Sequence, residues 1–134
     1  MTNGGYGAIL LAADPGQSFG GVLGSPEIAG MDLRGVRVIS LASCSSGVGE
    51  PTGMVNPDSL VRALLDAGAR NVVAAPWKVD STATDELFGD LYQRLRSTPN
   101  VAESLRQACL DIRSRPATAH PYFWAGFQTY GVPD

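Results

Sequence analysis

Two kinds of hydrophobic pattern alternate along the chain and predict strands separated by helices. Residues 36–42 hold five apolar residues in seven, three of them β-branched aliphatics. This near-continuous pattern is typical of a strand covered on both faces rather than of a half-exposed one. Residues 71–75 predict a second buried strand, led by Val72 and Val73. The aromatic-rich residues 121–131 predict a last strand and its approach.

Three helices are predicted between and after these strands. Asn56 and Pro57 have the chemistry of an N-cap and a first helical residue, and Gly68 ends that helix. The next helix is expected to begin near Thr82 with a capping box, and the third at Asn100. The predicted apolar faces are Leu60, Val61, Leu64 and Leu65 in the first, Ala83, Leu87, Phe88, Leu91 and Leu95 in the second, and Ala102, Leu105, Cys109 and Ile112 in the third.

The order of these elements predicts an α/β fold with a mostly parallel sheet. Right-handed crossovers through helices join parallel strands. Two short apolar runs, residues 8–13 and 19–23, flank a Pro-Gly turn and predict a hairpin that precedes these strands and helices in the chain. The strand at 36–42 is then expected at an edge, where unpaired backbone groups favour strand addition. The length of 134 residues indicates one domain, residues 1–134.

Composition narrows the class of protein and of partner. A hydrophobic share of 44% with 17% charged residues is typical of a globular chain. The net charge is −3 and Lys78 is the one lysine, so neither nucleic acid nor a membrane surface is expected as a partner. Two cysteines, with no signal-peptide pattern and no apolar run of roughly 20 residues, favour a reducing, cytoplasmic location.

Cys44 is the candidate nucleophile. It follows the strand at 36–42 and precedes a loop rich in glycine and serine, residues 45–55. Ligands of open α/β sheets bind beyond the carboxyl ends of the strands, so a thiol there suits nucleophilic chemistry. A buried cysteine that acts as a small hydrophobe is the alternative.

No cofactor and no metal are expected. The glycines Gly47, Gly49 and Gly53 are spaced G-x-G-x-x-x-G, which departs from the dinucleotide-binding fingerprint. The chain also has neither a Walker lysine motif nor the cysteine and histidine spacing of a metal site.

Six short strings match one known family in order and spacing. They are residues 41–47 (LASCSSG), 64–77 (LLDAGARNVVAAPW), 79–80 (VD), 83–84 (AT), 102–106 (AESLR) and 120–127 (HPYFWAGF). Together they resemble the C-terminal part of the CHAT domain, a caspase-like cysteine peptidase domain (clan CD) often attached to tetratricopeptide repeats and related to separase. The resemblance spans residues 8–131 and implies a caspase-like three-layer sandwich, here truncated at its N-terminal side.

The resemblance also implies roles for individual residues. Cys44 falls on the nucleophile of the family's Cys–His dyad, with Ser43 where the family has alanine. Trp77, Asp80 and Ser81 match the segment that helps form the pocket for the residue before the cut. Many relatives have a second acidic residue where this chain has Ser81, which weakens the expectation of a basic preference. Helix capping by Asp80 and core packing by Trp77 are the alternative interpretations.

The family's catalytic histidine lies upstream of the matched strings, in a histidine-glycine motif. His120 is the chain's one histidine and belongs to the His-Pro-aromatic-aromatic-Trp string, where a structural role is expected and a role as surrogate base is the alternative. Two functional hypotheses follow: part of a CHAT-type cysteine endopeptidase domain, or a catalytically inactive caspase-like interaction module. The expected partners are a protein or peptide substrate, a tetratricopeptide-repeat or N-terminal peptidase segment, and a second copy at the open sheet edge.

Overall fold

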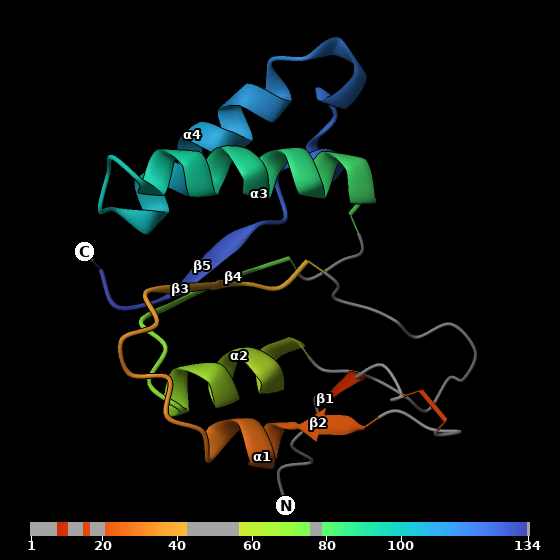
Figure 1. The fold of residues 1–134 in the computed structure, drawn as a ribbon. Helices are drawn as coiled ribbons and strands as arrows, with labels where there is room; N and C mark the ends of the chain where they lie inside the picture. The colour runs from red at the N-terminus through yellow and green to blue at the C-terminus, as the bar shows by residue number, and fades with distance from the viewer. Residues whose placement is uncertain (1–7, 11–14, 17–20, 43–56, 76–78, 134) are drawn as a thin grey trace, which may run out of the picture.

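A three-stranded sheet lies between two layers of helices in the computed structural model, which describes residues 8–10, 15–16, 21–42, 57–75 and 79–133 (Figure 1). The sheet contains β3 (Val38–Ser40), β4 (Asn71–Ala74) and β5 (Gln128–Gly131). One face carries α3 (Ser81–Leu95) and α4 (Val101–Arg113), and the short helices η1 (Pro116–Thr118) and η2 (Pro121–Phe123) lead from α4 to β5. The other face carries α2 (Pro57–Asp66) and α1 (Ser25–Ala29), beside a hairpin of β1 (Ala8–Leu10) and β2 (Val22–Gly24). The predicted α/β class and the predicted hairpin are confirmed.

The sheet mixes one parallel and one antiparallel pairing. Strand β4 lies in the middle, parallel to β3 and antiparallel to β5. A parallel crossover was expected for the last strand, and the two-helix connection explains the difference. Helix α3 leads back from the carboxyl end of β4, and α4 returns toward that end (Figure 1). Because two helices bring the chain back to its starting side, β5 must run opposite to β4.

The core has two halves that meet at β4. Val72 and Ala74 point into the half packed against α1 and α2, whereas Val73 and Ala75 point into the half packed against α3 and α4. Every residue of β4 is buried, as its apolar pattern predicts. Strand β3 is only partly buried along its length, since no strand of the described residues pairs with its outer side. It is also shorter than the apolar run that predicts it.

The buried face of α3 is the predicted one, whereas the buried face of α4 is rotated relative to the prediction. All five predicted core residues of α3 are buried. In α4, Ala102 is exposed, and the buried residues include Val101, Ser104 and Ala108 in its place. The side chain of Asn100 caps this helix by accepting from the Glu103 amide, as expected, so the branched Val101 takes the first inward position. None of the helices in the described ranges is long and apolar enough to cross a membrane.

Gly131 sits where no other residue fits. Its φ is +137°, and a Cβ built there would lie 2.1 Å from the carbonyl oxygen of Arg70. Glycine avoids both the strained backbone and this contact. The end of β5 can therefore approach the start of β4 as closely as the register between Asn71 and Gly131 requires.

We predict that Gly131→Ala lowers the free energy of unfolding by at least about 2 kcal/mol, because a main-chain contact and a positive φ must both be relieved. Gly89→Ala is the matched control. Gly89 lies inside α3, is exposed and has open space around its Cα. There the same substitution should be neutral or stabilise by up to about 1 kcal/mol. Urea unfolding of both variants measures the difference, and equal stabilities would contradict this account of Gly131.

Candidate functional site

The carboxyl ends of β3 and β4 lie side by side at one edge of the sheet. Ser40 pairs with Val73 in the parallel register, and the Leu41 amide donates to the Val73 carbonyl at 2.8 Å. This bond continues the ladder one residue beyond β3. We call the residues just past these ends, Leu41 and Ala42 after β3 and Ala75 after β4, the carboxyl rim. In open α/β sheets this is where ligands bind.

Asp80 caps helix α3, which begins close to the carboxyl rim in sequence. Its carboxylate accepts from the Ala83 amide at 3.0 Å, and its carbonyl accepts from the Thr84 hydroxyl at 2.8 Å. The predicted capping box starting at Thr82 is therefore wrong, because the helix begins two positions earlier than that box requires. Residues 80–82 are Asp-Ser-Thr, all good N-caps, so the local sequence allowed several registers. Asp80 remains exposed despite this bond.

Of the four predicted site residues, the structure describes Asp80 and Ser81. Ser81 is the first residue of α3 and is exposed. Cys44 and Trp77 lie outside the described residues. Their roles as nucleophile and pocket residue stay predictions.

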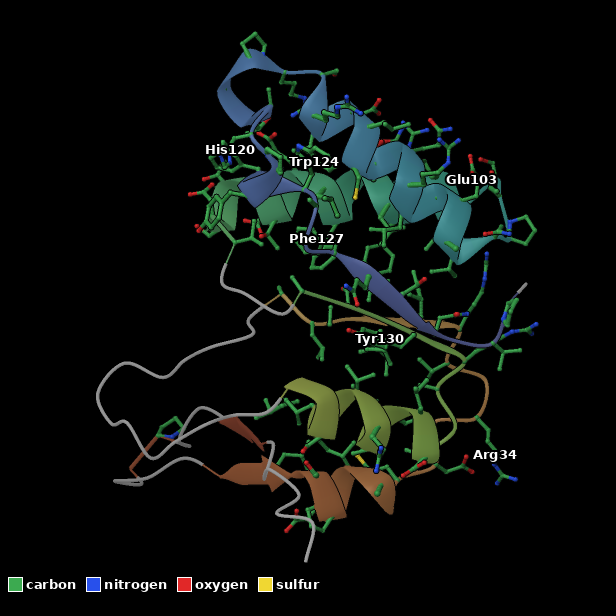
Figure 2. All side chains as sticks on the ribbon, turned by 180° about the vertical axis from the view of Figure 1, so that it is seen from behind. Arg34, Glu103, His120, Trp124, Phe127 and Tyr130 are labelled. Carbon is green, nitrogen blue, oxygen red and sulfur yellow. The ribbon has the colours of Figure 1, made fainter. Side chains whose placement is uncertain are left out.

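His120 is part of a structural corner between α4 and β5. Its Nδ1 accepts from the Tyr122 amide at 3.1 Å and so caps η2. The neighbouring Trp124 donates its indole N–H to the Ala119 carbonyl at 3.1 Å, and the Arg113 guanidinium lies 5.5 Å from its ring centre. Figure 2 shows His120, Trp124 and Phe127 along the path from α4 to the sheet. One ring nitrogen of His120 is thus held by the backbone, which favours the structural interpretation.

Cys109 is a packed thiol and not a reactive one. It lies partly buried against the core half formed by α3 and α4, and its thiol donates to the Trp124 carbonyl at 3.4 Å. Burial raises the pKa of this thiol to about 11. Because the thiolate is the nucleophilic form, Cys109 is inert near neutral pH. Its predicted place in the core is confirmed.

A hydroxyl pair that the sequence does not predict lies near the carboxyl rim. The Ser40 hydroxyl and the Tyr92 phenol are 2.9 Å apart and tie the end of β3 to α3. Tyr92 is nevertheless 42% exposed. The two residues are separated by 52 positions, so no local pattern indicates their contact. Within the described ranges, no group of three or more His, Cys, Asp or Glu side chains is placed to hold a metal ion.

Comparison with known proteins identifies the family. The sequence model described as "CHAT domain" matches residues 3–132. The mouse (Mus musculus) protein "Tetratricopeptide repeat protein 28" is 35% identical over 105 residues, which cover 75% of this chain and 4% of that protein. The chain thus spans only a small part of the curated relative that it matches. No solved structure matches it significantly. Since the family match covers nearly its whole length, the chain belongs to the CHAT domain family.

Proposed function

We propose that the chain is the C-terminal part of a CHAT-type cysteine endopeptidase domain, with Cys44 as the nucleophile. The carboxyl rim is the observation that supports this most. Cys44 lies two positions beyond Ala42, the last described residue after β3, and two residues reach at most about 7 Å. The thiol would then act at the edge of the sheet where β4 ends and α3 starts.

The proposed reaction is hydrolysis of a peptide bond through a thioester. An ordinary thiol is only a few per cent ionised at pH 7, so it needs a base. A histidine of the upstream segment takes the Cys44 proton, and the thiolate attacks the carbonyl carbon of the substrate. The backbone N–H of Cys44 helps to hold the developing oxyanion. The amine leaves with the proton from histidine, and water then hydrolyses the thioester to a carboxylate and the free thiol.

Trp77, Asp80 and Ser81 are the proposed contacts for the substrate residue before the cut. The Asp80 carboxylate accepts a hydrogen bond from the Ala83 amide, but it is exposed and places an acidic group at the start of α3. Ser81 adds a hydroxyl without charge. This pocket would therefore favour a basic side chain less strongly than one with two acidic groups.

The second candidate is a catalytically inactive interaction module. It is favoured by the bond that holds Nδ1 of His120 to the backbone, which supports a structural role for the chain's one histidine. The outer side of β3, unpaired within the described part of the sheet, would then bind a partner strand or a second copy. The relative's name makes a tetratricopeptide-repeat segment a natural partner under either hypothesis. A reducing compartment such as the cytoplasm would keep the Cys44 thiol free.

We predict that a peptidyl acyloxymethyl ketone labels Cys44 and not Cys109. Mass spectrometry of the intact protein measures the labelling. Cys44→Ala should abolish it, whereas Cys109→Ala should leave it unchanged, because the pKa of the Cys109 thiol is raised to about 11. Adding the upstream segment with its histidine-glycine motif should accelerate labelling by about 10²–10⁴-fold, the usual effect of a general base.

Iodoacetamide labelling in urea is the control that both thiols are intact. If the Cys44→Ala protein labels as fast as the wild type, Cys44 is not an activated nucleophile. If the upstream segment leaves the rate unchanged, the interaction module is the better account.

We predict that Asp80→Ala destabilises the protein by about 1 kcal/mol through loss of the N-cap, and that Asp80→Asn retains most of the stability. The Asn variant keeps an acceptor for the Ala83 amide but removes the charge. When peptide cleavage is assayed with the upstream segment added, Asp80→Asn should reduce cleavage after basic residues more than after neutral ones. If cleavage after basic and after neutral residues falls equally, Asp80 acts only as the helix cap and does not contact the substrate.

We predict that His120→Asn leaves both folding and Cys44 labelling unchanged, because asparagine also caps a helix through its side-chain oxygen. His120→Ala should cost about 0.5–1 kcal/mol by losing the acceptor for the Tyr122 amide. Thermal unfolding and the labelling rate are measured together. A labelling rate that falls in His120→Asn at unchanged stability would make His120 the surrogate base.

A further inference from the structure

A small cavity lies at the end of the sheet opposite to the carboxyl rim. Its volume is about 160 Å³. The lining residues that matter here are Asn71, Asn100, Ala102, Thr129, Gly131 and Val132. They come from the start of β4, the end of β5 and the first turn of α4, which meet where the chain just after β5 passes the turn between α3 and α4 (Figure 1). Neither Asp80 nor Ser81, the described residues of the proposed peptidase site, lines this cavity.

Asn71 brings an unpaired donor to this cavity. The residue is 5% exposed, and its side-chain nitrogen has no hydrogen-bond partner among the described residues. The absence of a side chain at Gly131 leaves room beside the amide, because a Cβ there would lie 3.0 Å from Asn71 Oδ1. Buried amide donors are almost always paired in native proteins. Asn71 itself lines the cavity, and the terminal torsion of asparagine is broad, so its amide is able to turn and donate to a ligand there.

The first turn of α4 adds a positive potential. The Asn100 side-chain oxygen is occupied by the Glu103 amide at 2.8 Å, which leaves its NH₂ group as the available donor. Ala102 lies in the first turn, where backbone N–H groups lack intrahelical acceptors and favour anions. The Arg37 guanidinium donates to the Pro99 carbonyl at 2.6 Å, directly before the cap.

The acidic side chain in the first turn of α4 is already paired with an arginine. Glu103 is the acidic residue of the first turn of α4, and its carboxylate is paired with Arg106 at 2.7 and 2.8 Å. This pairing lowers the pKa of Glu103 to about 2. The side chains that line the cavity include no acidic residue in the described part of the chain. Val132 and the methyl group of Ala102 supply apolar wall.

We propose that this cavity binds a carboxylate group on a short apolar stem. The carboxylate oxygens accept from Asn71 and from the N-terminal donors of α4, and the stem packs against Val132. Two sources share this chemistry: a free short-chain carboxylic acid and the C-terminal carboxylate of a peptide. A ligand of this size binds with a dissociation constant on the order of 1 mM.

The test is a titration of the ¹⁵N-labelled chain followed by ¹H–¹⁵N correlation spectra. The probes are butyrate, N-acetyl-alanyl-alanine and the uncharged butyramide. The two carboxylates should shift the side-chain NH₂ signals of Asn71 and the backbone amides of Ala102 and Gly131, and butyramide should not. Tighter binding of the dipeptide indicates a peptide C-terminus as the ligand, and tighter binding of butyrate indicates a free acid.

A matched pair of variants at Asn100 tests the charge requirement without removing the helix cap. Both Asn100→Asp and Asn100→Ser retain an oxygen for the Glu103 amide. The Asp variant should weaken butyrate binding by at least about tenfold through like-charge repulsion, and the Ser variant should weaken it much less. The proposal is overturned if neither carboxylate shifts these signals, if butyramide shifts them equally, or if Asn100→Asp binds butyrate like the wild type.

Discussion

Burial of β4 on both faces is the constraint on which the rest of the structure depends. Val72 and Val73 are both fully buried although they point to opposite faces of the sheet. A strand with two apolar faces has to be covered by helices on both sides, and the chain supplies α1 with α2 for one face and α3 with α4 for the other. Once β4 is fixed in this way, its two ends define two separate places where loops and helix ends converge.

The direction of β5 decides what each end of β4 contains. Helices α3 and α4 together return the chain to the carboxyl end of β4. Strand β5 therefore runs from there toward the amino end of β4 and ends beside Asn71. The carboxyl end therefore receives the start of α3 with Asp80, and the amino end receives Gly131 and the start of α4. A parallel β5 would have put the last residues of the sheet at the carboxyl rim and left Asn71 without this cavity.

Features set by local chemistry were predictable, and features set by contacts across the fold were not. The α3 core face follows from its helical spacing, and the burial of β4 follows from its apolar run. The cap of α3 was misplaced because Asp80 and Thr82 both suit an N-cap, and only the packed register chooses Asp80. The antiparallel direction of β5 depends on the number of helices that connect β4 to β5. The unpaired side-chain nitrogen of Asn71 has no local signal, since its partner in the strand register, Gly131, lies 60 positions away along the chain.

The partly buried state of β3 connects the two functional hypotheses. A strand added parallel to its outer side would lie about 4.8 Å away and would end at the same carboxyl rim. In the CHAT family as the resemblance describes it, the strand before the nucleophile's strand ends in the histidine-glycine motif. Under the peptidase proposal, one strand would complete both the sheet and the dyad, because the strand that covers Val38 and Ile39 would also bring the histidine to the carboxyl rim. A partner strand without that histidine would cover the same edge and leave the thiol inactive, so the identity of the added strand determines which hypothesis holds.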